Sequence, residues 1–189
     1  MAVSVMGGHL PYIHNSSDNS DVKLCKYTGH SLREVPIRVI TVGKKRSRGV
    51  QLIVDEYKEK LQHYCNIDDI LIRSNPRNAR DAKAQTEDED GAVLGLIKTN
   101  DWVVILDERG QDVSSERLAE FIGDAGFTGA ERMLFCIGGP YGHGRQLRQR
   151  ANQSIKLSSL ILNHQIALVV LMEQLYRAWT ILKGQKYHH

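Results

Sequence analysis

The glycines that follow a predicted strand are the residues whose type and spacing first suggest chemistry. In the stretch "MLFCIGGPYGHGRQL", Met133 to Leu147, five apolar residues run directly into two glycines, a proline and two more glycines, before a basic segment of helical character. A glycine-rich turn after a strand can bring backbone amides against a phosphate or a nucleotide. The stretch therefore predicts a ligand-binding turn.

The flanking residues narrow the kind of ligand. From Gly139 to Gly144 the spacing matches G-x-x-x-x-G, but Arg145 and Gln146 stand where a phosphate loop has Lys and Ser or Thr. In a phosphate loop, the Lys reaches the phosphates and the Ser or Thr binds magnesium. The dinucleotide-binding spacing G-x-G-x-x-G is absent as well. Nucleoside triphosphatases and Rossmann dehydrogenases are therefore disfavoured. The glycines are better suited to a tight turn that passes close to a neutral or cationic ligand.

Two other segments are candidates for the same site. They are "LDERG", Leu106 to Gly110, and "LSSLILNHQ", Leu157 to Gln165, an apolar run that ends on Asn, His and Gln. Ligands of open α/β sheets bind beyond the carboxyl ends of the strands, so segments that follow strands are the places to search.

The elements that would position these segments alternate from Pro36 onward. Short apolar or β-branched runs predict buried parallel strands at 37–42, 67–73, 102–107 and 133–138, and amphipathic patterns predict helices at 49–63, 80–98 and 114–124. This alternation predicts an α/β domain with a mostly parallel sheet. In the segment 165–182, apolar residues cover more than one stripe, which predicts either a helix buried against a second subunit or an internal core helix.

Composition and charge limit the partners. The chain has 189 residues and a net charge of +3, within the range of one soluble globular domain. From Arg132 to the end it has eight Lys or Arg and one acid, Glu173, so this third is strongly basic while the rest is net acidic. Such a lobe suits a polyanionic partner, and a solvated helix face is the open alternative. The three cysteines, which form no close pair, favour a reducing compartment.

Residues 1–35 differ from the rest. They are rich in Gly, Asn, Ser and His, include the polar run "HNSSDNSD", and show no periodic pattern. We predict a poorly ordered N-terminal extension (1–35) before a single domain (36–189). The extension has no secretory signal core, a weak targeting role stays open, and no segment is long and apolar enough to span a membrane.

Four segments together resemble a known family. "LDERG", "FCIGGPYG", "KLSSLILNH" and "EQLYRAWTILKGQKYHH" occur in the order and approximate spacing of the RlmH-type family of SPOUT methyltransferases, which methylate N3 of a pseudouridine in large-subunit (23S-type) ribosomal RNA. The resemblance covers about Pro36 to His189, and its most specific part is "LYRAW" with a terminal "YH". It implies a C-terminal trefoil knot, a homodimer whose substrate contacts both subunits, and the ribosome as partner.

The resemblance also implies the cofactor and its pocket. The cofactor would be S-adenosylmethionine, with no metal, and it would lie in the knot. Its pocket would be formed by residues after the third strand, in the glycine turn and in the late loop: Leu106, Asp107, Gly138, Gly139, Ser158, Ser159, Leu160, Ile161, Leu162 and Asn163.

Four residues are candidates for catalysis, because the imide nitrogen of a pseudouridine must lose its proton. His164 would act as a base or would only satisfy a buried backbone group, and Arg177 would stabilise the anion or only pair with Glu173 one helical turn away. Tyr187 and His188 lie on a tail that is disordered by default, although the resemblance places that tail at the active site.

Three departures from the family pattern leave an alternative open. Tyr141 replaces an acid, Asn163 and Gln165 replace prolines around the histidine, and His189 replaces a terminal Arg or Lys. A pocket that relies on backbone survives such changes, whereas a lost terminal cation affects the grip on phosphate. The alternative is an RNA-binding or ribosome-binding protein that keeps the fold without the reaction. The compartment stays open between a bacterial-type cytoplasm and an organelle, either chloroplast or mitochondrion.

Overall fold

The computed structural model describes residues 25–74 and 81–186 of the chain. Strands and helices alternate along it: β1 (Ile37–Gly43), α1 (Arg48–Leu61), β2 (Ile67–Arg73), α2 (Ala82–Leu94), β3 (Asp101–Asp112), α3 (Ser115–Phe127), β4 (Arg132–Ile137), α4 (Arg145–Arg150), β5 (Gln153–Lys156) and α5 (His164–Leu182). Tyr187 and His188, two of the predicted catalytic residues, lie outside the described residues.

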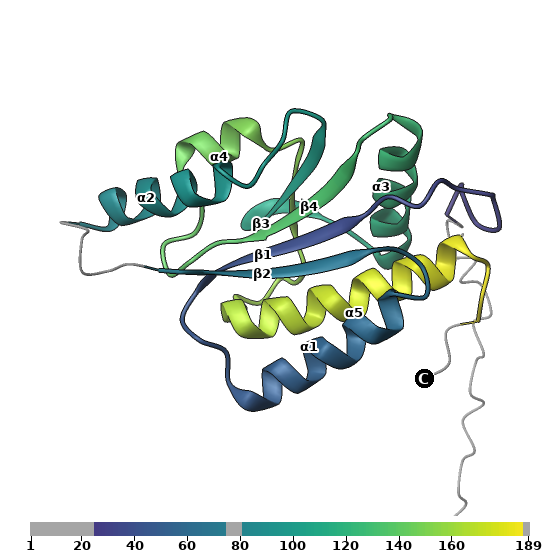
Figure 1. The fold of residues 1–189 in the computed structure, drawn as a ribbon, viewed down its shortest axis with the longest axis horizontal. Helices are drawn as coiled ribbons and strands as arrows, with labels where there is room; N and C mark the ends of the chain where they lie inside the picture. Colours follow the sequence, from purple (N-terminus) through teal and green to yellow (C-terminus); the bar gives the residue numbers. More distant parts are fainter. Residues whose placement is uncertain (1–24, 75–80, 187–189) are drawn as a thin grey trace, which may run out of the picture.

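The five strands form one parallel sheet with the order β2-β1-β4-β3-β5. Helices cover both faces: α2 and α4 lie on one, and α1 and α5 lie on the other (Figure 1), where α3 also packs against α5. The predicted α/β architecture with a parallel sheet is therefore confirmed. Among the described helices, none combines the length and hydropathy of a membrane span.

Alternating side chains of the strands fill two cores. In β1, Ile37 and Val39 belong to the larger core under α1, α3 and α5, whereas Ile40 and Val42 belong to the smaller core under α2 and α4. Burial on both faces explains why the strands read as continuous apolar runs in the sequence.

Side-chain caps begin the long helices where the sequence supplies Ser, Asp or Asn. Ser47, Asp81, Ser114 and Asn163 each accept a hydrogen bond from a backbone N–H in the first turn of α1, α2, α3 and α5. Each such cap stabilises its helix by about 1 kcal/mol.

Two features differ from the predicted elements. β3 continues to Asp112, past the predicted end at Asp107, and β5 was not predicted. β5 has four residues, and Ile155 is buried while its neighbours are half-buried, so it carries too little periodic pattern to be recognised.

Part of the predicted N-terminal extension packs against the domain. Tyr27 donates a hydrogen bond to Asp124 of α3 at 2.6 Å, and its ring lies over Gly123. The backbone N–H of Gly29 donates to the carbonyl of Leu182 at 2.8 Å. Residues 25–35 thus join the ends of α3 and α5.

Helix α5 is mostly covered within one chain. It packs between α1 and α3, and Leu168, Leu171, Leu175 and Trp179 are buried there. Ile166 in its first turn remains about half exposed.

Candidate active site

A pocket of about 880 Å³ opens at the carboxyl ends of the strands. Its volume is within the range of small-molecule sites. The carboxyl ends of β1, β4 and β5 and the segments after them contribute to it, with Ser74 after β2, the bulged part of β3, one side chain of α2 and the first turn of α5. The residues are Gly43, Lys44, Ser74, Gln85, Leu106–Glu108, Ile137–Gly142, Ile155–Ser158, Leu160–His164 and Ala167.

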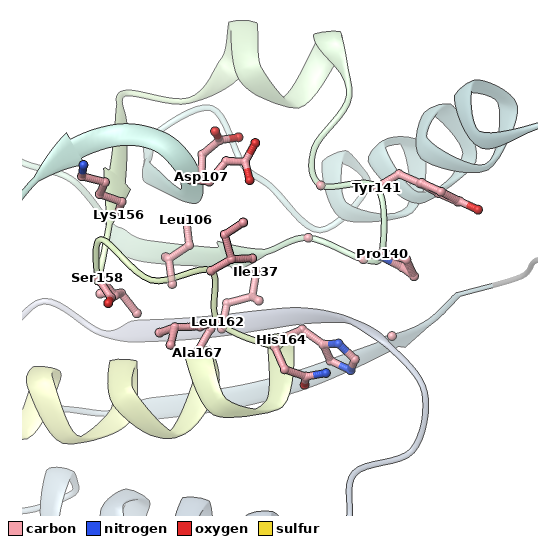
Figure 2. A pocket seen from close by; sticks show the side chains of 18 of the residues that line it. Leu106, Asp107, Ile137, Pro140, Tyr141, Lys156, Ser158, Leu162, His164 and Ala167 are labelled. Carbon is pink, nitrogen blue, oxygen red and sulfur yellow. The ribbon is translucent and has the colours of Figure 1, made fainter.

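The centre of the pocket is apolar. Figure 2 shows Leu106 in β3 just before its bulge, Ile137 at the end of β4 and Leu162 before α5 pointing toward a common space. Tyr141, at the tip of the glycine turn, is 58% exposed and points away from that space (Figure 2). Tyr141 therefore does not enter the apolar centre of the pocket.

The glycine turn closes on itself and presents main chain to the pocket. The N–H of Gly142 donates to the carbonyl of Gly139 at 3.0 Å, and Gly142 has a φ of +74°, a conformation that glycine adopts without strain. A Cβ on Gly138 would lie 2.7 Å from the carbonyl carbon of Gly142. Both positions therefore require glycine.

A bulge in β3 forms the opposite wall. Ile155 of β5 is paired with both Leu106 and Gln111, so Asp107 to Gly110 leave the ladder between them. At Gly110 the chain returns so closely that a Cβ would lie 2.4 Å from the backbone of Ile155. The bulge places the backbone of Leu106 and Asp107 at the pocket.

A polar network of buried His143 and Asp107 with the partly exposed Arg148 connects the bulge to the glycine turn. The Nε2–H of His143 donates to the carbonyl of Leu106 at 3.1 Å, and Arg148 forms an ion pair with Asp107 and donates from Nε to the carbonyl of His143 at 2.9 Å. Two predicted cofactor segments are therefore fixed relative to each other.

The network sets the ionisation of its members. Burial lowers the pKa of His143 below 6.5, outweighing the hydrogen bond to Leu106, so the imidazole is neutral at pH 7. Burial raises the pKa of Asp107, but hydrogen bonds from the Arg109 N–H and from Arg148 outweigh it and leave the pKa below 3.8. Asp107 is therefore a carboxylate at neutral pH.

Two buried carboxylates of α2 support the turn from below. Asp90 accepts hydrogen bonds from the N–H groups of Gly144 at 2.9 Å and Leu147 at 3.0 Å, which begins α4. Glu89 accepts from Ser74 and Gln85, and its other oxygen faces the α-carbon of Gly139.

The predicted cofactor residues converge on this pocket, with one exception. Leu106, Asp107, Gly138, Gly139, Ser158 and Leu160 to Asn163 line it, whereas Ser159 does not.

Of the predicted catalytic residues, His164 lies at the pocket. Its ring packs on Gly43, where a Cβ would lie 3.0 Å from Nε2, and Nε2 is buried with no hydrogen-bond partner in the described part of the chain. Arg177 pairs with Glu173 and lies about 20 Å from His164 along α5, at about 1.5 Å per residue. One chain therefore does not bring His164 and Arg177 together.

The sequence argument missed several lining residues. Gly43 ends β1, Lys44 follows it and Ser74 follows β2, so the rule that ligands lie at the carboxyl ends of strands would have found them if applied to every strand. Gln85 lines the pocket, whereas His143 does not line it and instead joins the bulge to the glycine turn. Neither residue carried a local signal, because their positions depend on packing between α2, the bulge and the glycine turn. No group of three or more His, Cys, Asp or Glu in the described ranges could hold a metal ion.

Together, a wholly parallel sheet and a largely apolar pocket at the carboxyl ends of its strands define an α/β protein with a pocket of the size of a small-molecule site. Residues 35–188 match the family model described as "Predicted SPOUT methyltransferase". The chain belongs to the SPOUT methyltransferase family, so the predicted resemblance and the predicted class of enzyme are confirmed.

Relatives with assigned names agree with this family. An Arabidopsis thaliana protein provisionally named as an RNA methyltransferase is 62% identical over 193 residues, covering 100% of both chains. The proteins named ribosomal RNA large subunit methyltransferase H are 36% identical in Christiangramia forsetii, over 81% of this chain and 98% of the relative, and 37% identical in Clostridium novyi, over 80% and 98%.

One similar solved structure is the SpoU methyltransferase AviRb from Streptomyces viridochromogenes in complex with AdoMet. It is 16% identical with a TM-score of 0.41, and the match covers 78% of this chain and 59% of that one.

Proposed function

We propose that this chain transfers a methyl group from S-adenosylmethionine to large-subunit ribosomal RNA, at N3 of a pseudouridine. The observation that carries the proposal is that three late segments, 106–108, 137–142 and 155–164, meet at one pocket. The relatives named ribosomal RNA large subunit methyltransferase H support the class of substrate, because the match covers 98% of their length.

The residues present fit S-adenosylmethionine. Leu106, Ile137 and Leu162 would hold its adenine between apolar side chains, and the main chain at Gly138 and Gly139 would approach it where no Cβ blocks the way. When bound, the cofactor supplies an electrophilic methyl group on a sulfonium sulfur. The pocket's task is alignment, which can contribute about 7–11 kcal/mol to such a transfer.

His164 accepts the proton that the imide nitrogen must lose. Its Nε2 has no hydrogen-bond partner among the described residues, and the ring lies at the pocket against Gly43. A base in that position can contribute about 10²–10⁴ in rate.

A second copy of the chain completes the site, and the C-terminal part forms a trefoil knot. Arg177 lies far from His164 in its own chain, which supports a site shared across a dimer, and the tail with Tyr187 and His188 would take part in it. Exposed apolar side chains support the same arrangement: Leu160 and Ile161 in the loop that lines the pocket, Ile166 in the first turn of α5, and Leu52 and Ile53 of α1.

The direct test uses ribosomal RNA from a strain that lacks the modification. The purified chain and S-adenosylmethionine are added to ribosomes or large subunits, and the RNA is digested and examined by mass spectrometry. The expected result is a mass increase of one methyl group at a single pseudouridine. If binding of RNA persists and no methyl group appears, the chain is an RNA-binding protein of this fold without the reaction.

A further inference from the structure

A basic segment lies at the rim of the pocket, outside the strongly basic C-terminal third. In the run Lys44 to Arg48, four of the five residues are Lys or Arg. Lys44 lines the pocket, and Lys44, Lys45 and Arg48 are exposed. This segment connects β1 to α1 on the side of the pocket where His164 lies.

Three contacts fix the segment in place. Arg46 forms an ion pair with Asp69 of β2, both side chains being 5% exposed, and its second nitrogen donates to Asp69 at 2.7 Å. The N–H of Ser47 donates to the side chain of Gln165 at 3.0 Å, next to His164. The basic segment is therefore held in a fixed position next to the first turn of α5.

The remaining charges of the segment have no ion-pair partner in the described part of the chain. Arg46 is paired with Asp69, whereas Lys44, Lys45 and Arg48 form no ion pair with any residue in ranges 25–74 and 81–186. The first turn of α1 also contains no acidic residue. Three like charges held together on a fixed loop suit a polyanion whose phosphates replace the missing counter-charges.

We propose that Lys44, Lys45 and Arg48 bind the phosphodiester backbone of the RNA whose base enters the pocket. This inference rests on the proposed function for the identity of the RNA. Lys44 lines the pocket and the other two cations lie beyond it, so the matching ligand is a chain of phosphates that extends past the pocket. Such contacts position the RNA relative to His164 and carry no base specificity.

Salt dependence of RNA binding tests the assignment. Binding of labelled large-subunit ribosomal RNA is measured over a range of salt concentrations for the whole chain, for Lys44→Ala and for the double variant Lys45→Ala/Arg48→Ala. The slope of the logarithm of the binding constant against the logarithm of the salt concentration should fall in magnitude by about 1 for each lost phosphate contact. The expected fall is therefore about 1 for Lys44→Ala and about 2 for the double variant. The loss of affinity should be the same factor for an unrelated RNA of equal length.

A matched control removes two lysines near the amino ends of the strands, at the opposite end of the sheet from the pocket. Lys58 is in the last turn of α1 and Lys98 precedes β3, so Lys58→Ala/Lys98→Ala should leave the slope unchanged. All variants change side chains that are largely at the surface, and equal melting temperatures will show that they fold alike. Calorimetry should give an unchanged affinity for S-adenosylmethionine in Lys45→Ala/Arg48→Ala.

The outcomes separate this inference from the proposed function. Wild-type slopes in both rim variants would overturn the inference, even if the wild-type chain methylates the RNA. Reduced slopes without methylation by the wild-type chain would support the RNA contact and refute the methyl transfer. The affinity of the rim variants for uridine monophosphate is measured as well. If the variants bind uridine monophosphate more weakly than the wild-type chain but bind RNA equally well, the inference would be overturned in favour of a free-nucleotide site.

Discussion

At the scale of single residues, the pocket depends on a few side chains with unusual surroundings. His164 has a buried Nε2 without a partner in the described ranges, and His143 is a buried neutral imidazole that joins the β3 bulge to the glycine turn. The sequence pointed to His164 as a candidate site residue, because it stands at the end of an apolar run. The sequence did not point to His143, because the role of His143 follows from contacts that the sequence does not encode locally.

The His164→Ala variant should separate chemistry from binding. If His164 accepts the proton, the turnover rate should fall by about 10²–10⁴ with the affinity for S-adenosylmethionine unchanged within a few-fold. Single-turnover methylation and calorimetry measure the two quantities. A residue that only packs on Gly43 would instead be replaceable by Asn without loss of rate, and that result would remove His164 from the mechanism.

The His143→Gln variant should change how stability depends on pH. The pKa of His143 is lowered in the folded chain, so between that value and 6.5 the unfolded chain binds a proton that the folded chain does not. The free energy of unfolding of the wild-type chain should therefore fall as pH drops below 6.5, by at most about 1.4 kcal/mol per pH unit for this group.

Urea unfolding at several pH values between neutrality and pH 5 measures this effect. The difference between wild type and His143→Gln should shrink as the pH falls, because the contribution of the neutral imidazole is present above its ordinary pKa. A difference that is constant with pH would contradict the assignment of a buried neutral histidine.

At the scale of elements, the strands and long helices could be predicted and their detailed ends could not. β1, β2 and α5 follow from apolar runs, whereas β5 is too short to carry a pattern and the β3 bulge depends on Gly110 passing close to Ile155. The predicted segments after β3, after β4 and before α5 do meet at one pocket. The contributions of Lys44 and Ser74 were missed because the search stopped at three of the five strand ends.

The connection from the glycine turn to the start of α4 should depend on Asp90 for its stability. Replacing Asp90 by Ala leaves the N–H groups of Gly144 and Leu147 without their acceptor, and Leu147 is fully buried. We expect a loss of about 1–3 kcal/mol in the free energy of unfolding. The exposed neighbour Asp88 offers a control, since Asp88→Ala should change stability by less than about 0.5 kcal/mol. Equal stability of the two variants in urea unfolding would show that the cap is not needed.

At the scale of the whole molecule, one chain forms the pocket but keeps two of the proposed catalytic residues apart. His164 lies at the pocket and Arg177 about 20 Å further along α5. α5 is mostly covered by α1 and α3 of its own chain, so the apolar pattern of this helix alone does not require a dimer. What favours a second copy is the group of exposed apolar side chains near the pocket.

The Ile166→Glu variant tests the proposed dimer. Ile166 is 48% exposed in the first turn of α5, so a charge there would be tolerated in a monomer but costly in an apolar interface. We expect the wild-type chain to sediment as a dimer and Ile166→Glu to shift toward the monomer, with a fall in methylation. Sedimentation of the wild-type chain as a monomer at micromolar concentration would contradict the shared site.

Calorimetric titration of the purified chain with S-adenosylmethionine tests the central claim, a methyl-donor pocket built from main chain, most directly. We predict saturable binding, weakened about 10-fold or more in Gly138→Ala, because a Cβ there would lie 2.7 Å from Gly142 and distort the turn. Gly91→Ala, with no atom within 4 Å of the added Cβ, should bind like wild type. No binding by the folded wild-type chain, or equal binding by Gly138→Ala, would contradict the account.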